Sequence, residues 1–191
     1  TLAYRQQFGG GRGQAIAKAV GIKHGKRPSV LDITAGLARD AYVLASLGCK
    51  LCLIEQSPVL YALIEDGIRR GQRDTACADI LKNFTCWVNA NAIEYMRTIN
   101  NKNRPDVIYI DPMYPDRKKS ALVKKDMRIL QRLLPKNQND DQLLTTALGC
   151  AAERVVVKRP LHAPALGDIP ADTSICSKKT RFDVYLVKNK P

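Results

Sequence analysis

The sequence predicts an α/β fold: one domain with a mostly parallel sheet of seven strands, a C-terminal antiparallel hairpin, and helices on both faces. Strand and helix patterns alternate over residues 29–70, in the β-α-β-α order that builds a parallel sheet with right-handed crossovers. Residues 106–110 are rich in Val, Ile and Tyr and lie between Pro105 and Pro112, as expected of a buried strand. Near the end of the chain, two further β-rich segments are close enough to pair as a hairpin.

Local signals mark where the elements begin and end. Gly21 and Gly48 are expected to stop the helices before them, because glycine readily adopts the left-handed conformation of a helix C-cap. Ser57 is suited to cap a helix that has Pro58 as its first residue. The expected helices span residues 14–20, 41–47, 58–70, 75–84, 92–99, 127–134 and 142–153. The expected strands lie at the start of 29–40, at 50–55, 85–88, 106–110 and 154–158, and in the hairpin at 174–177 and 183–187. We assign residues 1–28 to a Gly/Arg-rich N-terminal loop and helix, and residues 29–191 to the main domain.

Length and composition fit a globular protein. The 191 residues can bury a core without disulfides or metals, and 45% hydrophobic with 26% charged residues is typical of a soluble domain. No apolar run approaches the roughly 20 residues of a membrane span, and no signal peptide is recognisable. The six cysteines lack the spacing of a zinc site, so we expect all of them to be free and the protein to be intracellular.

The charge is strongly positive and unevenly distributed. Lys and Arg number 31 against 18 Asp and Glu, a net charge of +13, which favours a polyanionic partner such as nucleic acid. A generally basic surface is the alternative. Several cations follow Tyr114 closely: Arg117, Lys118, Lys119, Lys124, Lys125, Arg128 and Arg132.

Acidic residues follow the first, second and fourth predicted strands, whose carboxyl ends meet at one edge of a parallel sheet. Glu55, after the second strand, is suited to accept both ribose hydroxyls of a nucleoside cofactor, because a carboxylate offers two acceptor oxygens. A dinucleotide site would need G-x-G-x-x-G in the first turn, but these positions are Thr34, Gly36 and Ala38. The turn resembles instead the D-x-G-x-G-x-G loop that binds S-adenosylmethionine, with Gly36 at its centre.

The segment Asp111-Pro112-Met113-Tyr114 resembles the [DNS]-P-P-[YFW] motif of enzymes that methylate exocyclic amino groups. An amine conjugated with an aromatic ring is a poor nucleophile until acceptors hold its N–H groups. The Asp111 carboxylate and the Pro112 carbonyl can each accept one N–H and turn the nitrogen lone pair toward a methyl donor. Tyr114 offers a stacking face for the base. A proline turn after a strand that ends in aspartate is the structural alternative, and Met113 departs from the motif.

Longer motifs resemble one family more closely. They are Phe8-Gly9-Gly10-Gly11-Arg12-Gly13, the segment from Asp32 to Asp40, Asp111 to Pro115 with Lys118 to Lys125, and Val155 to Pro160. Together they are similar to the RsmJ family, which methylates guanine N2 near the 3′ end of small-subunit ribosomal RNA. The resemblance implies a Rossmann-like class I methyltransferase fold, S-adenosylmethionine as cofactor, ribosomal RNA or the small ribosomal subunit as partner, a cytoplasmic location, and neither metal nor membrane.

The resemblance also implies roles for individual residues. Asp111, Pro112 and Tyr114 would be catalytic. Cofactor contact would come from Asp32, Ala35, Gly36, Arg39, Asp40, Glu55, Gln56, Asn91, Ala92 and Asp111. RNA contact is expected from Arg12, Lys118, Lys119, Lys124, Lys125 and Lys158, for which a solvated charged surface is the alternative. Family members carry a further N-terminal segment before Phe8, so we expect a truncated chain whose RNA binding is weakened and whose cofactor site is intact.

Other functions remain open at this stage. The four-residue motif alone also fits methylation of adenine N6 or another amino group in RNA or DNA. A non-catalytic RNA-binding domain on the same scaffold would retain RNA without cofactor affinity. A nicotinamide oxidoreductase is disfavoured by the incomplete glycine fingerprint.

Overall fold

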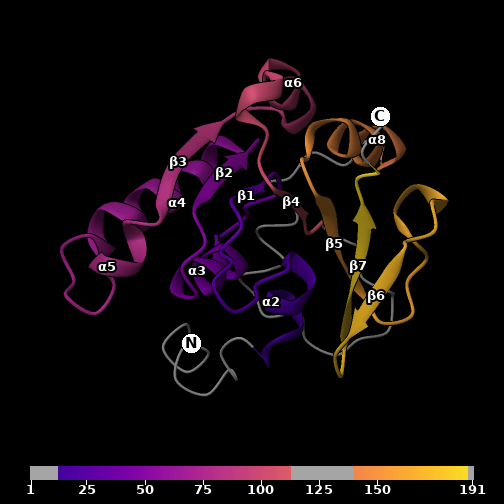
Figure 1. Cartoon of the computed structure of the whole chain (residues 1–191). Helices are drawn as coiled ribbons and strands as arrows, with labels where there is room; N and C mark the ends of the chain where they lie inside the picture. Colours follow the sequence, from indigo (N-terminus) through magenta and orange to yellow (C-terminus); the bar gives the residue numbers. More distant parts are fainter. Residues whose placement is uncertain (1–12, 113–139, 189–191) are drawn as a thin grey trace, which may run out of the picture.

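The computed structural model describes residues 13–112 and 140–188 (Figure 1). The helices are α2 (Ala15–Val20), α3 (Arg39–Ser46), α4 (Pro58–Gly71), α5 (Ala78–Leu81), α6 (Ala92–Thr98) and α8 (Asp140–Cys150), with 3-10 turns η2 (Asn101–Asn103) and η3 (Leu166–Asp168). The strands are β1 (Val30–Asp32), β2 (Leu51–Glu55), β3 (Phe84–Asn89), β4 (Val107–Ile110), β5 (Arg154–Pro160), β6 (Thr173–Cys176) and β7 (Thr180–Leu186).

The strands form one sheet in the order β3-β2-β1-β4-β5-β7-β6. Strands β1 to β5 run parallel, and β7 is antiparallel to both β5 and β6. The predicted α/β fold with a parallel sheet and a closing hairpin is therefore confirmed. Because the order reverses between β1 and β4, a crevice is expected at the carboxyl ends of these two strands.

Two cores cover the two faces of the sheet. Alternate residues of β4 face opposite cores: Val107 and Tyr109 join one, Ile108 and Ile110 the other, and all four are at most 1% exposed. The first core also contains apolar residues of α2, α3, α4 and α5, and the second those of α6, α8 and η3. Figure 1 shows α6 and α8 grouped away from α2 and α3. The uninterrupted apolar run that predicted β4 thus reflects burial on both sides.

The capping signals act as expected. Gly21 ends α2 with a φ of 84°, and its N–H donates to backbone carbonyls of that helix. The Ser57 side chain accepts the N–H of Leu60 at the start of α4, where Pro58 is the first helical residue. Asn91 caps α6 by accepting the N–H groups of Ile93 and Glu94. The Ser57 and Asn91 caps fix where the chain turns after β2 and β3, at the carboxyl edge of the sheet.

Some boundaries differ from the predicted ones. The helix expected over 75–84 is only α5, and the second hairpin strand begins at Thr180 instead of Asp183. Thr180 and Arg181 are polar, which hides their strand character in the sequence, but they pair with Pro160 and Arg159 of β5. The helix expected over 127–134 lies outside the described residues.

The prediction that all six cysteines are free is wrong, because Cys52 and Cys86 form a disulfide. The two residues are 34 positions apart, but they are register partners on the neighbouring strands β2 and β3, with Cα atoms 4.6 Å apart. A register shift between Leu51 and Cys52 brings them opposite each other, and sequence spacing carries no sign of that shift. The free cysteines are Cys49, Cys77, Cys150 and Cys176.

Over 13–112 and 140–188, no helix has the length and apolar character needed to cross a membrane. Nor do those residues contain a group of three or more His, Cys, Asp or Glu side chains arranged to hold a metal ion.

Candidate active site

The ionisable residues predicted for the site lie at the carboxyl ends of four neighbouring strands. Asp32 ends β1, Glu55 ends β2, Asp111 follows β4, and Lys158 lies near the end of β5. Two residues before each of them, on the strand, is a residue of the core that contains α2, α3, α4 and α5. These core residues are Val30, Leu53, Tyr109 and Val156. Because side chains alternate between faces along a strand, all four are directed to the α3 side of the sheet. The sheet thus gathers residues that are far apart in the sequence.

The turn after β1 is compact and held by hydrogen bonds. Asp32 is 3% exposed, and its Oδ1 accepts the backbone N–H of Thr34 at 3.1 Å. The N–H of Ala35 donates to the Ile54 carbonyl of β2 at 3.1 Å. Gly36 has a φ of 56°, and Ala38, the residue before α3, also has a positive φ. The left-handed conformation at Gly36 explains why this position of the turn favours glycine.

Glu55 links this turn to the end of β2. Its Oε2 accepts the N–H of Gly36 and its Oε1 accepts the N–H of Ser57, both at 2.8 Å. Burial raises the pKa of Glu55, and these backbone hydrogen bonds oppose the rise. A carboxylate offers about four acceptor positions, and backbone N–H groups of Ser57, Gly36 and Gln56 interact with this one. Glu55 therefore holds the turn and retains some acceptor capacity for a hydroxyl group.

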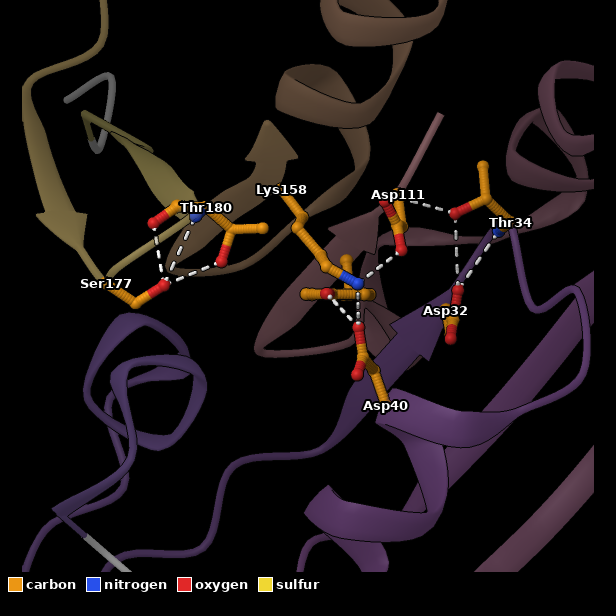
Figure 2. Close-up of polar contacts among 8 residues, drawn as sticks. Asp32, Thr34, Asp40, Asp111, Lys158, Ser177 and Thr180 are labelled. Carbon is orange, nitrogen blue, oxygen red and sulfur yellow. Dashed lines mark hydrogen bonds and ion pairs between the residues drawn. The ribbon is translucent and has the colours of Figure 1, made fainter. Parts of the chain in front are cut away.

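Lys158 joins two of the carboxylates. Its Nζ donates to Asp40 Oδ2 and to Asp111 Oδ2, each at 2.7 Å (Figure 2). The Tyr109 hydroxyl donates to the same Asp40 oxygen at 2.9 Å. The Asp111 side chain is 39% exposed and that of Asp40 only 13%, so Asp111 is the carboxylate more open to a ligand.

The Asp111 backbone is also fixed. Its N–H donates to the Thr34 hydroxyl at 2.7 Å, and that hydroxyl lies 3.5 Å from Asp32 Oδ1. Figure 2 shows this connection from the turn after β1 to the end of β4. The position of the Asp111-Pro112 peptide is therefore coupled to the glycine turn that we predicted to bind the cofactor.

This group of residues at the carboxyl edge of the sheet contains more acidic than basic side chains. Burial raises the pKa of Asp32 to about 8, opposed by the Thr34 N–H and increased further by Asp40. Burial also raises the pKa of Asp111, whereas the Lys158 ammonium lowers it. Burial lowers the pKa of Lys158, but Asp111 and Asp40 raise it more, so the net shift is upward. A cationic ligand would complement these carboxylates and would favour the ionised form of Asp32.

Other predicted residues lie around this centre. Arg39 is exposed at the start of α3, Gln56 follows β2, and Pro112 follows Asp111. Asn91 and Ala92 lie after β3 at the start of α6, where Asn91 uses its side-chain oxygen as the helix cap and Ala92 is buried. The predicted residues outside the described ranges are Arg12, Tyr114, Lys118, Lys119, Lys124 and Lys125.

Two residues of this hydrogen-bond network were not predicted from the sequence as site residues. Tyr109 was assigned only to a strand and Thr34 only to a glycine-like position, yet their hydroxyls bind Asp40 and the Asp111 backbone. Tyr109 is two residues before Asp111, so the alternation of strand side chains could have placed both on one face. The sequence has no comparable signal for Thr34, because its bond depends on how β1 and β4 are paired.

The chain is similar to known methyltransferases in sequence and in fold. A family model described as "Putative SAM-dependent methyltransferase" matches residues 1–187. The ribosomal RNA small subunit methyltransferase J of Colwellia psychrerythraea is 53% identical over 191 residues, 100% of this chain and 69% of that protein. The protein of the same name from Nitrosococcus oceani is 52% identical over 186 residues, 97% of this chain and 73% of that protein. The crystal structure of a SAM-dependent methyltransferase from Neisseria gonorrhoeae superposes with a TM-score of 0.80 at 37% identity, covering 100% of this chain and 73% of that one.

The fold of the sheet and these matches show a methyltransferase that uses S-adenosylmethionine. More narrowly, the chain belongs to the family of ribosomal RNA small subunit methyltransferase J.

Proposed function

We propose that this chain transfers the methyl group of S-adenosylmethionine to the exocyclic N2 amino group of a guanine in small-subunit ribosomal RNA. The observation that carries the proposal is the position of Asp111 and Pro112, at the end of β4 and hydrogen-bonded to the cofactor turn through Thr34. The relatives' name indicates a small-subunit ribosomal RNA substrate. Such a substrate implies work in the cytoplasm, where ribosomes are found.

Backbone access at Gly36 and the carboxylates around it support binding of this cofactor. A Cβ added at Gly36 would have the Thr34 carbonyl as its nearest neighbour, at 3.8 Å, so a ligand can approach the backbone closely here. Glu55 would hold the ribose hydroxyls through its remaining acceptor positions. Asp32, Ala35, Arg39 and Asp40 would surround the methionine part, and Gln56, Asn91 and Ala92 the adenine. When bound, the cofactor supplies a sulfonium methyl group that an amine nitrogen can attack.

Asp111 and Pro112 would prepare the amine. One N–H of the guanine amino group donates to the Asp111 carboxylate and the other to the Pro112 carbonyl, which directs the nitrogen lone pair toward the methyl carbon. With the donor bound, the new N–C bond would form as the S–C bond breaks, and the electron pair of the broken bond would remain on sulfur. The nitrogen would then lose a proton, and Asp111 would be the acceptor of that N–H.

Basic residues would hold the RNA around this point. Tyr114 would stack on the target base, and Arg12, Lys118, Lys119, Lys124 and Lys125 would contact phosphates. Lys158 lies at the rim of the crevice, where its 23% exposed side chain can reach a phosphate while it also positions Asp111.

The proposal predicts a single missing modification in cells that lack the protein. Ribosomal RNA from such cells, digested and mapped by mass spectrometry, should lack one N2-methylguanine near the 3′ end of the small-subunit RNA. The wild-type gene should restore this methyl group. The Asp111→Ala variant should not, because it removes one of the two acceptors of the amine, a loss of roughly 100-fold or more in rate.

Two controls make the result specific. Purified Asp111→Ala should retain the wild-type circular dichroism spectrum and should still bind S-adenosylmethionine in calorimetry, so that lost activity is not lost folding. A missing methyl group on adenine N6 would overturn the guanine assignment. Near-normal methylation by Asp111→Ala would remove Asp111 from the mechanism.

A further inference from the structure

A basic turn lies at the same edge of the sheet as the proposed methyl-transfer site. Because β7 runs antiparallel to β5, Thr180 at the start of β7 pairs with Pro160 at the end of β5. The Leu161 N–H also donates to the Lys179 carbonyl at 3.2 Å. The turn from Ser177 to Thr180 therefore lies beside the end of β5, and Lys158 is two residues before the last residue of that strand. Figure 2 shows Ser177 and Thr180 in the same view as Lys158 and Asp111.

The turn is held in one conformation by its own hydrogen bonds. The Ser177 N–H donates to the Thr180 carbonyl at 2.7 Å, and the Ser177 hydroxyl lies 2.7 Å from the Thr180 hydroxyl. Arg181 anchors the turn, with one guanidinium nitrogen donating to the Leu161 carbonyl at 2.9 Å and another to Asp183 at 2.8 Å. Because the turn is already ordered, a ligand that binds it would incur little cost in conformational entropy.

Lys178 and Lys179 occupy the tip of this turn and are both exposed. Within the part of the chain that the structure describes, neither forms an ion pair. Lys158 differs, because its ammonium already binds two carboxylates. This edge of the sheet thus has two parts. The carboxylates around Asp111 suit an amino group and a cationic cofactor, and the ammonium groups of Lys178 and Lys179 beside them suit anionic groups.

We propose that the turn Ser177–Thr180 is an RNA-binding element in which Lys178 and Lys179 contact phosphates of the strand that carries the target base. The inference rests on the proposed function and adds a specific surface to it. A nucleic acid fits both halves of this edge, because its base carries the amino group and its backbone carries the charges that the lysines bind.

The test compares two double variants that remove the same charge from opposite edges of the sheet. Lys178→Ala with Lys179→Ala changes the proposed surface. Lys50→Ala with Lys102→Ala is the matched control, because Lys50 precedes β2, Lys102 lies in η2 before β4, and both are exposed. Each protein is titrated with a fragment from the 3′ end of small-subunit ribosomal RNA at several salt concentrations, and methyl transfer to the same RNA is measured.

For the Lys178/Lys179 variant we expect the Kd and KM for RNA to rise roughly tenfold at low salt. The slope of log K against log salt should become shallower by about 1.4 to 1.8, as for two lost phosphate contacts. The kcat at saturating RNA and the affinity for S-adenosylmethionine should match those of the wild type, and the control variant should keep the wild-type slope.

The outcomes separate this inference from the proposed function. Suppose that the wild type methylates the RNA, but the Lys178/Lys179 variant keeps the wild-type salt slope or the Lys50/Lys102 control loses as much RNA affinity. The turn is then not the RNA-binding element, and the proposed function stands. If the wild type neither binds nor methylates the RNA, both proposals are overturned.

Discussion

Lys158 holds together the two carboxylates on which the proposed chemistry depends. The sequence predicted it as an RNA contact, because a lysine near the end of a strand beside the cleft can reach a phosphate. The structure adds contacts to Asp40 and Asp111 that follow from the pairing of β4 with β5, in which Ile110 lies opposite Val157. The next residues along the two strands, Asp111 and Lys158, are therefore level with each other. The sequence therefore predicted that Lys158 lies at this edge of the sheet, but it did not predict that Lys158 binds Asp40 and Asp111.

We predict that Lys158→Met lowers methyl transfer at pH 7 by about tenfold and moves the activity profile to higher pH. Burial raises the pKa of Asp111 and the Lys158 ammonium opposes this, so without the cation the pKa of Asp111 rises further. A larger fraction of Asp111 would then be protonated at a given pH, so its full capacity as an acceptor would require a higher pH than in the wild type. Lys158→Arg retains the positive charge and should keep the wild-type profile. Initial rates of both variants from pH 6 to 9 provide the measurement, and a Met variant with an unshifted profile would contradict this role.

Among the elements, the turn between β1 and α3 was the most informative part of the sequence. Its resemblance to a cofactor loop identified Gly36, and the positive φ of that residue agrees with the glycine requirement. The turn also depends on contacts that local sequence does not encode. Glu55 of β2 accepts the Gly36 N–H, and the Thr34 hydroxyl binds the Asp111 backbone. The elements were predictable because periodicity and caps are local, whereas these side-chain contacts arise from strand pairing.

Two glycine variants separate the conformational role of this turn from its binding role. Gly36→Ala and Gly25→Ala each place alanine at a positive φ, of 56° and 77°, and neither new Cβ would meet an atom closer than 3.8 Å. Both should lower the free energy of unfolding by about 1 kcal/mol, measured by urea denaturation. Only Gly36→Ala should weaken S-adenosylmethionine binding in calorimetry, because Gly25 lies in the exposed turn between Lys23 and Lys26. Equal cofactor affinity in the two variants would argue against close approach of the cofactor at Gly36.

At the scale of the whole molecule, the described residues form two cores on opposite faces of one sheet, and the central strands of this sheet are covered on both faces. The sequence predicted this layered form, since its apolar strands alternate with amphipathic helices. It did not predict the Cys52–Cys86 disulfide, which depends on the register between β2 and β3. The fold class could thus be predicted from patterns along the chain. The disulfide and the ion pairs between strands could not, because they depend on how the strands are paired.

This layering predicts a gradient of amide hydrogen exchange. Amides of β4, which lies between β1 and β5 and is at most 1% exposed, should exchange only when the whole domain unfolds. Those of the edge strand β6, which is largely exposed, should exchange by local opening and therefore much faster. Exchange followed by mass spectrometry of peptides would measure both. Protection of β6 equal to that of β4 would indicate that the hairpin opens only with the rest of the domain.

The antiparallel direction of β7 has a practical consequence for handling the enzyme. Leu186 pairs with Arg154 at the start of β5, and the Val187 N–H donates to the Glu153 carbonyl, so the chain leaves the sheet at the edge opposite to Asp111. Figure 1 shows this end beside α8, away from the turn between β6 and β7. A fluorophore attached at the exposed Lys188 would therefore lie at the edge of the sheet opposite to Asp111, away from the proposed methyl-transfer site.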